Sequence, residues 1–222
     1  MGSIYWQLND NWPVASWSSI DYFGRWKALH YIAKRAYDNV LVSCAKDGHR
    51  VSVHVSNEQK EPVSGTIDWK LIDVTGKTIA SGTDRVAVSG LASISGLSVD
   101  LSEHLKEKMP RDRFFICRFS EAGGRTHSSF CLFELYKYLA LKKPAYKWDV
   151  RETGESFEIS ISSNVPALFV ELDLAQKDVV FSDNYFHLDG QEKRVITVSK
   201  NEMTLNILNN ELQVRSLADS YL

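Results

Sequence analysis

Short runs of alternating apolar and polar residues recur along the chain from about residue 39 onward. Clear examples are residues 50–55 and 66–71, and turn-forming pairs such as Asp47-Gly48 and Gly123-Gly124 separate the runs. A period of two places every second side chain on one face, as in a strand with one buried face. Short strands at this spacing predict antiparallel β-sandwiches. The other expected strands are 94–101, 114–119, 129–135, 157–161, 167–174, 179–181, 194–198 and 203–208.

The segment 139–144, which reads Leu-Ala-Leu-Lys-Lys-Pro, is the best candidate for a linker between domains. We therefore expect one sandwich at residues 37–143 and a second at 144–222. Pieces of about 100 and 80 residues suit immunoglobulin-like modules. Residues 1–36 follow a different pattern and form a third expected region.

That first region begins with an apolar run, Ser3–Leu8, that leads directly into Asn9, Asp10 and Asn11. Polar groups crowded at the C-terminal end of a hydrophobic strand are typical of the substrate-facing end of an α/β barrel. A single strand of this kind cannot form a domain, so we expect it to pack on another part of the protein.

One helix is expected after this strand. Ser18 and Asp21 have the spacing of a capping box, although Gly24 weakens the first turn. Residues recurring at helical spacing form one apolar stripe, made of Trp26, Leu29, Ala33 and Ala36. Three basic residues fall outside that stripe, namely Lys27, Lys34 and Arg35.

Residues 1–31, MGSIYWQLNDNWPVASWSSIDYFGRWKALHY, and the next few up to about residue 36 closely resemble the last barrel strand and following helix of β-mannosidases in glycoside hydrolase family 2. Residues 179–186, VVFSDNYF, with Asp189-Gly190-Gln191, resemble the signature of the last immunoglobulin-like domain of that family. The resemblance implies a predominantly all-β fold. In it, two immunoglobulin-like antiparallel β-sandwiches follow a strand-helix remnant of a (β/α)8 barrel.

The resemblance also implies a function. Family members are retaining glycosidases that release terminal β-mannose, with two glutamates roughly 5 Å apart at the ends of barrel strands four and seven. Both glutamates would lie upstream of this chain, so we expect no catalytic residue in it and no activity from it alone. Its role would be that of an accessory β-sandwich scaffold. Its expected partners are the upstream barrel and, in the intact enzyme, an oligosaccharide or glycoprotein substrate. The alternative is a carbohydrate-binding module without hydrolase activity, which the 11% aromatic content favours.

By resemblance, Trp6 is the foremost candidate for substrate binding, because a tryptophan at the end of the last barrel strand forms an apolar wall of the sugar site. The C–H face of a pyranose packs well on an aromatic ring, but Trp6 could instead fill the barrel core or a domain junction. Asn9 and Asp10 could hydrogen-bond the sugar or fix the loop. We expect Trp12 and Trp17 to pack against other residues.

Charge and composition exclude several other functions. The net charge is −2, so neither nucleic acid nor a membrane is an expected partner. The six histidines are scattered without metal-ligand spacing, and we expect no metal and no cofactor. Three cysteines, an odd number, argue against a disulfide framework and predict reduced, buried thiols. Cys117 and Cys131 flank a hairpin turn, and a three-residue loop would set them opposite each other.

Overall fold

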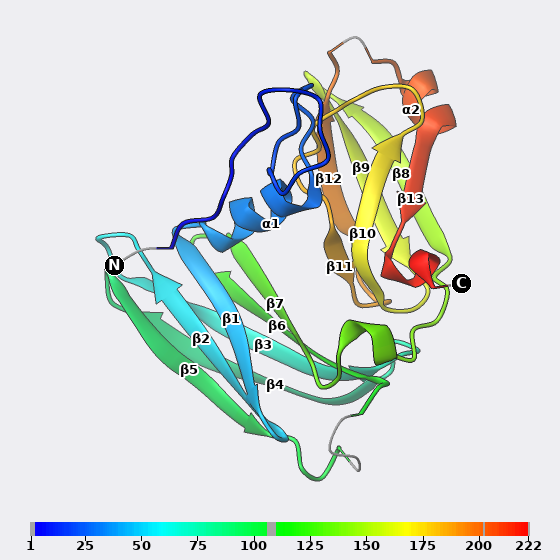
Figure 1. The fold of residues 1–222 in the computed structure, drawn as a ribbon. Helices are drawn as coiled ribbons and strands as arrows, with labels where there is room; N and C mark the ends of the chain where they lie inside the picture. The colour runs from blue at the N-terminus through cyan, green and yellow to red at the C-terminus, as the bar shows by residue number, and fades with distance from the viewer. Residues whose placement is uncertain (1–2, 106–109, 202, 222) are drawn as a thin grey trace. The chain divides into compact units, whose positions relative to one another are not determined.

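The computed structural model describes residues 3–105, 110–201 and 203–221. The chain divides into two compact units, one of residues 37–142 and one that combines residues 1–36 with 143–222 (Figure 1). The N-terminal region therefore belongs to the same unit as the C-terminal residues. Within the described part, no helix is long and apolar enough to cross a membrane.

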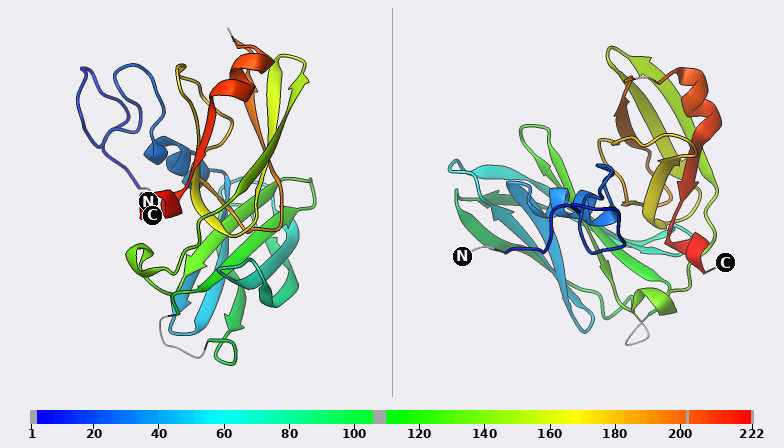
Figure 2. Two further views of the ribbon diagram at one scale, coloured as in Figure 1. Left: turned by 90° about the vertical axis from the view of Figure 1, so that its right-hand side faces the viewer. Right: turned by 45° about the horizontal axis from the view of Figure 1, so that its top comes forward.

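The unit of residues 37–142 is a β-sandwich of two antiparallel sheets (Figure 2). The strand orders are β1-β2-β5 in one sheet and β4-β3-β6-β7 in the other (Figure 1). A short 3-10 helix, η1 (Tyr136–Tyr138), follows the last strand. The strands are β1 (Val40–Asp47), β2 (Arg50–Asn57), β3 (Val63–Asp73), β4 (Thr78–Val88), β5 (Ala92–Asp100), β6 (Arg113–Glu121) and β7 (Thr126–Leu132).

The alternating pattern places the core of this sandwich between its sheets. In β2, Val51, Val53 and Val55 are fully buried, whereas the residues between them remain partly exposed. Ile67 of β3 and Phe119 of β6, in the other sheet, are also fully buried and belong to the same apolar cluster. The period of two in the sequence therefore identified the inner face correctly.

The second unit contains a smaller sandwich with strand orders β12-β9-β8 and β11-β10-β13. Its short helices are α2 (Leu205–Glu211) and the 3-10 helix η2 (Leu217–Ser220). The strands are β8 (Tyr146–Thr153), β9 (Ser156–Ser163), β10 (Ala167–Leu174), β11 (Phe186–Leu188), β12 (Arg194–Ser199) and β13 (Leu212–Arg215).

Two expected strands near the C-terminus are absent. The segment Met203–Leu208 was predicted to be extended, but α2 begins within it because the Thr204 side chain accepts a hydrogen bond from the Ile207 amide and caps the helix. At residues 179–181 the structure has one isolated bridge, between Phe181 and Val198, and no strand. The strands β1, β4, β8, β11 and β13 were not among those expected.

The N-terminal region also differs from expectation. Residues 3–8 form no strand. The Gln7 and Leu8 carbonyls accept hydrogen bonds from the backbone amides of Ser19 and Ile20, and one isolated bridge follows, but a strand requires a continuous hydrogen-bonded neighbour. The expected helix exists as α1 (Ala28–Ala36), but it begins well after Ser18. Asp21 instead closes a turn by accepting hydrogen bonds from the backbone amides of Phe23 and Arg25.

Candidate functional site

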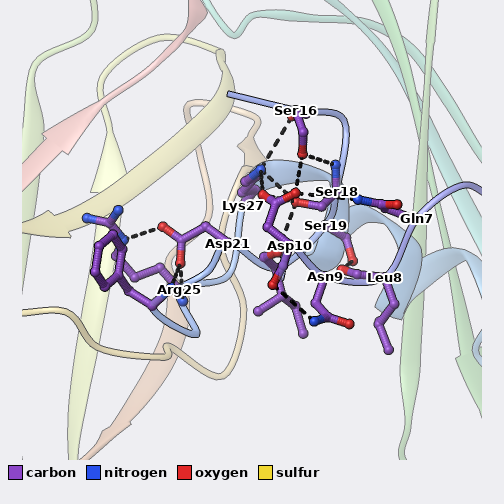
Figure 3. Close-up of polar contacts among 12 residues, drawn as sticks. Gln7, Leu8, Asn9, Asp10, Ser16, Ser18, Ser19, Asp21, Arg25 and Lys27 are labelled. Carbon is purple, nitrogen blue, oxygen red and sulfur yellow. Dashed lines mark hydrogen bonds and ion pairs between the residues drawn. The ribbon is translucent and has the colours of Figure 1, made fainter. Parts of the chain in front are cut away.

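The loop of residues 3–27 is organised around the carboxylate of Asp10 (Figure 3). Its Oδ1 accepts a hydrogen bond from the Ser16 hydroxyl at 2.6 Å, and its Oδ2 accepts one from the Ser18 hydroxyl at 2.7 Å. Lys27 lies just before α1, and its Nζ is 3.1 Å from Oδ2 and 2.7 Å from the Ser18 hydroxyl. The carboxylate therefore joins three segments of the loop.

These donors also determine the charge of the site. Hydrogen bonds from Ser16 and Ser18, with the Lys27 ammonium, lower the pKa of Asp10 to about 2. Asp10 is only 5% exposed, so a charge here requires such partners. The carboxylate is consequently ionised at neutral pH and its oxygens are occupied.

A second hydrogen-bonded centre, the Ser19 hydroxyl, closes the loop onto α1. It donates to the Leu8 carbonyl at 2.9 Å and lies 3.0 Å from both the Tyr5 hydroxyl and His30 Nδ1. Burial and the nearby Lys34 ammonium lower the pKa of His30.

The structure separates the three residues predicted to bind substrate into two environments. Asp10 is buried in the loop, where it fixes the backbone. Trp6 is 74% exposed, and Asn9 is exposed with its side-chain amide donating to the Asp10 carbonyl at 3.2 Å. Trp12 and Trp17, which we expected to pack, are 66% and 73% exposed. Sugar binding by Trp6, Asn9 and Asp10 stays a prediction.

Helix α1 attaches this loop to the C-terminal sandwich. Tyr31 is buried, and its hydroxyl accepts a hydrogen bond from the Phe181 amide at 3.2 Å. Its ring also lies 5.2 Å from that of Trp26 and 6.0 Å from that of Tyr185, measured between ring centroids. The buried face of the helix is therefore centred on Tyr31, whereas Leu29 of the expected stripe is partly exposed.

Two basic residues that fall outside the expected stripe carry much of this attachment. The guanidinium of Arg35 pairs with Asp183 and donates to the carbonyls of Asn184 at 2.9 Å and Tyr185 at 3.1 Å. Lys34 donates to a carbonyl of the same loop, that of Ser182, at 2.8 Å. Sequence reasoning treated these residues as peripheral, because their partners lie about 150 positions away.

The loop of residues 182–185 also bonds to two strands of the sandwich, β12 and β10. Asp183 also pairs with Arg194 of β12. Asn184 is buried, and its side-chain amide bonds both the amide and the carbonyl of Leu172 in β10, each at 2.8 Å. These bonds give the loop a structural role: it is the surface to which α1 attaches.

Comparisons with known proteins agree with this architecture. A family model described as a Mannosidase Ig/CBM-like domain matches residues 49–138, and a mannosidase family model described as an Ig-fold domain matches residues 141–220. Beta-mannosidase A of Aspergillus terreus is 31% identical over 99% of this chain and 25% of its own length. The beta-mannosidase of Bos taurus is 25% identical over 100% of this chain and 26% of its own length. The chain thus spans about a quarter of these relatives.

Solved structures show the same fold. The β-D-mannosidase of Dictyoglomus thermophilum superposes with a TM-score of 0.81 at 24% identity, over 95% of this chain and 25% of that one. The exo-chitosanase of Amycolatopsis orientalis superposes with a TM-score of 0.67 at 17% identity, over 96% and 29% of the two chains. The chain corresponds to the region of glycoside hydrolase family 2 β-mannosidases that holds their two immunoglobulin-like domains.

Proposed function

We propose that this chain is the accessory part of a β-mannosidase, a retaining glycoside hydrolase that releases terminal β-mannose from an oligosaccharide or glycoprotein. In this proposal the chain carries out no hydrolysis alone. Its two sandwiches support a catalytic barrel, and the loop of residues 3–27 reaches the sugar site of that barrel. The observation that carries the proposal is the Asp10-centred loop, which holds its own backbone in place while Trp6 remains exposed.

The state of Asp10 argues against catalysis by this loop. A glycosidase needs a carboxylic acid with a raised pKa to protonate the leaving oxygen. Hydrogen bonds from Ser16 and Ser18 shift the pKa of Asp10 in the opposite direction, to about 2. The same donors and Lys27 occupy both oxygens, which leaves Asp10 unsuited to attack an anomeric carbon.

The exposed apolar surface of the loop supports a barrel as its partner. Ile4 is 97% exposed, and further exposed apolar side chains on this one segment are Trp6, Leu8, Trp12, Val14 and Trp17. Several large apolar side chains exposed along one segment are typical of a surface that another protein part covers. We therefore propose that the catalytic barrel covers part of this segment and leaves Trp6 facing the sugar.

Trp6→Ala in the full-length enzyme tests the sugar contact, with Trp12→Ala as a matched control. Stacking of this kind is worth about 1–3 kcal/mol per ring, so Trp6→Ala should lower kcat/KM on an aryl β-mannoside about 5- to 150-fold. Trp12→Ala should change kcat/KM less than threefold. Equal losses in both variants, or no loss with Trp6→Ala, would refute the assigned contact.

The carbohydrate-binding alternative has one specific observation in its favour, the CBM-like description of the family model over residues 49–138. In that unit Tyr136 and Tyr138 of η1 are partly exposed, whereas Trp69 stacks on Phe115. Calorimetric titration of the chain with manno-oligosaccharides separates the two proposals. Heat that saturates, and that Tyr136→Ala abolishes, would favour the binding module.

A further inference from the structure

Two cysteines from opposite sheets of the first sandwich meet at one point. Cys44 lies on β1 and Cys117 on β6, and these strands belong to different sheets. The two residues are 73 positions apart, yet their Sγ atoms are 3.3 Å apart. Both thiols are free. A disulfide requires about 2.05 Å between sulfurs, so a closure of little more than 1 Å separates the two states.

The third cysteine, Cys131, lies on β7, the strand beside β6 in the sheet. In the β6-β7 ladder Cys117 faces Ser129, and Cys131 faces Phe115. The hairpin register therefore sets neither cysteine directly opposite the other, in contrast to the pairing that a three-residue loop had suggested. Cys131 is buried and free, and burial raises its pKa to about 11.

We propose that Cys44 and Cys117 form an intramolecular disulfide that links the two sheets when the protein meets a low-molecular-weight disulfide. The Cys44 thiolate attacks the reagent disulfide, forms a mixed disulfide and releases one thiolate. The Cys117 thiol then loses its proton and attacks the Cys44 sulfur, which releases the second thiolate. Two protein thiols are oxidised by two electrons, and the reagent disulfide is reduced to two thiols.

The surroundings of each thiol determine this order. Cys44, in the middle of β1, is half-buried, whereas Cys117 is fully buried, so a reagent reaches Cys44 first. Hydrogen bonds from the Cys117 thiol and the Ser129 hydroxyl lower the pKa of Cys44. Cys117 is fully buried, and its pKa is raised by its bond to Cys44 and by burial. Cys117 thus reacts second, inside the sandwich.

The test is to incubate the folded 222-residue chain with oxidised glutathione, block the remaining thiols and map tryptic peptides without reduction. Cleavage after Lys and Arg places the cysteines on separate peptides, residues 36–46, 114–118 and 126–137. We expect the free thiol content to fall from three to one, with a single linked peptide pair that joins 36–46 to 114–118. Dithiothreitol should restore all three thiols.

Variants identify each step. Cys131→Ser is the matched control and should form the same linked pair. Cys117→Ser should stop at a mixed disulfide on Cys44, and circular dichroism should show that it remains folded. Three persistent thiols in the native chain, glutathione held on Cys44 without closure, or a bond that involves Cys131 would each overturn the proposal. These outcomes are read on the native chain, so a variant that fails to fold does not affect them.

Discussion

Asp10 is a nearly buried acid whose partners are all local, and its low pKa makes the stability of the loop depend on pH. A carboxylate with a pKa of about 2 in the folded protein, against 3.8 ordinarily, stabilises the fold fully above about pH 4. That contribution is lost as the pH falls through about 2. We expect Asp10→Asn to lower the free energy of unfolding at pH 6, and the difference from the native chain to shrink below pH 4. Urea unfolding at several pH values measures this difference.

The neighbouring residue provides the control for that measurement. Asn9 is exposed and donates one hydrogen bond to a backbone carbonyl, so Asn9→Ala should cause a small change that does not vary with pH. If Asp10→Asn destabilises the chain equally at pH 6 and pH 2.5, the hydrogen-bonded carboxylate is not the cause.

Arg35 joins α1 to the 182–185 loop, and its removal should weaken the C-terminal unit. Arg35→Ala removes two hydrogen bonds to carbonyls and the pairing with Asp183. Charged hydrogen bonds of this kind are worth about 1.5–3 kcal/mol each in other proteins, and partial exposure of Arg35 reduces the effect, so we expect a loss of about 2 kcal/mol. Arg151→Ala is the matched control, since its 3.4 Å ion pair with Asp149 is fully at the surface. A loss below 0.5 kcal/mol, about that expected for the control, would contradict the anchoring role of Arg35.

At the scale of elements, the sequence predicted that a helix forms more accurately than it predicted which face of the helix is buried. Helix α1 was expected, with a stripe of Trp26, Leu29, Ala33 and Ala36. Ala33 is buried as expected, but the large buried side chain is Tyr31, outside that stripe. Apolarity indicates the buried face only when the partner surface is apolar. Here the partner surface is polar: Asp183 and the Asn184 carbonyl accept hydrogen bonds from Arg35, and the Phe181 amide donates one to the Tyr31 hydroxyl.

The strands show the same limit. Residues 50–55 and 66–71 were predicted because one face of each is buried against the other sheet. Most residues of β4 are exposed or half-buried, so it lacks a clear alternation. Residues 3–8 have the composition of a buried strand and yet form none, because a strand also depends on a neighbour that a sequence pattern cannot supply.

The N-cap of helix α2, Thr204, is a local helix signal that we missed because residues 203–208 also alternate like a strand. Thr204→Ala removes the hydrogen bond between the Thr204 side chain and the Ile207 amide and should cost about 1 kcal/mol. Thr204→Ser should retain most of that stability, because a serine hydroxyl caps equally well. Denaturant unfolding compares the two variants. If both lose the same amount, the cap does not stabilise α2.

For the whole molecule, the two segments that carry the family resemblance turn out to be in contact. Helix α1 is the last part of the first signature, and the loop of residues 182–185 lies within the second. The sequence identified both segments but not their contact, because hydrogen bonds between residues about 150 positions apart produce no repeating pattern in the sequence. The pairing places the N-terminal loop on the C-terminal sandwich, as the proposed scaffold role requires.

The most direct measurement is a turnover assay of the purified 222-residue chain on an aryl β-mannoside, beside the full-length enzyme at equal concentration. The account predicts release of the aryl alcohol by the full-length enzyme and a rate no higher than buffer for the chain. The Asp10→Asn variant of the chain should give the same blank rate. Turnover by the chain that exceeds the blank and that Asp10→Asn abolishes would contradict the account and would make the loop itself catalytic.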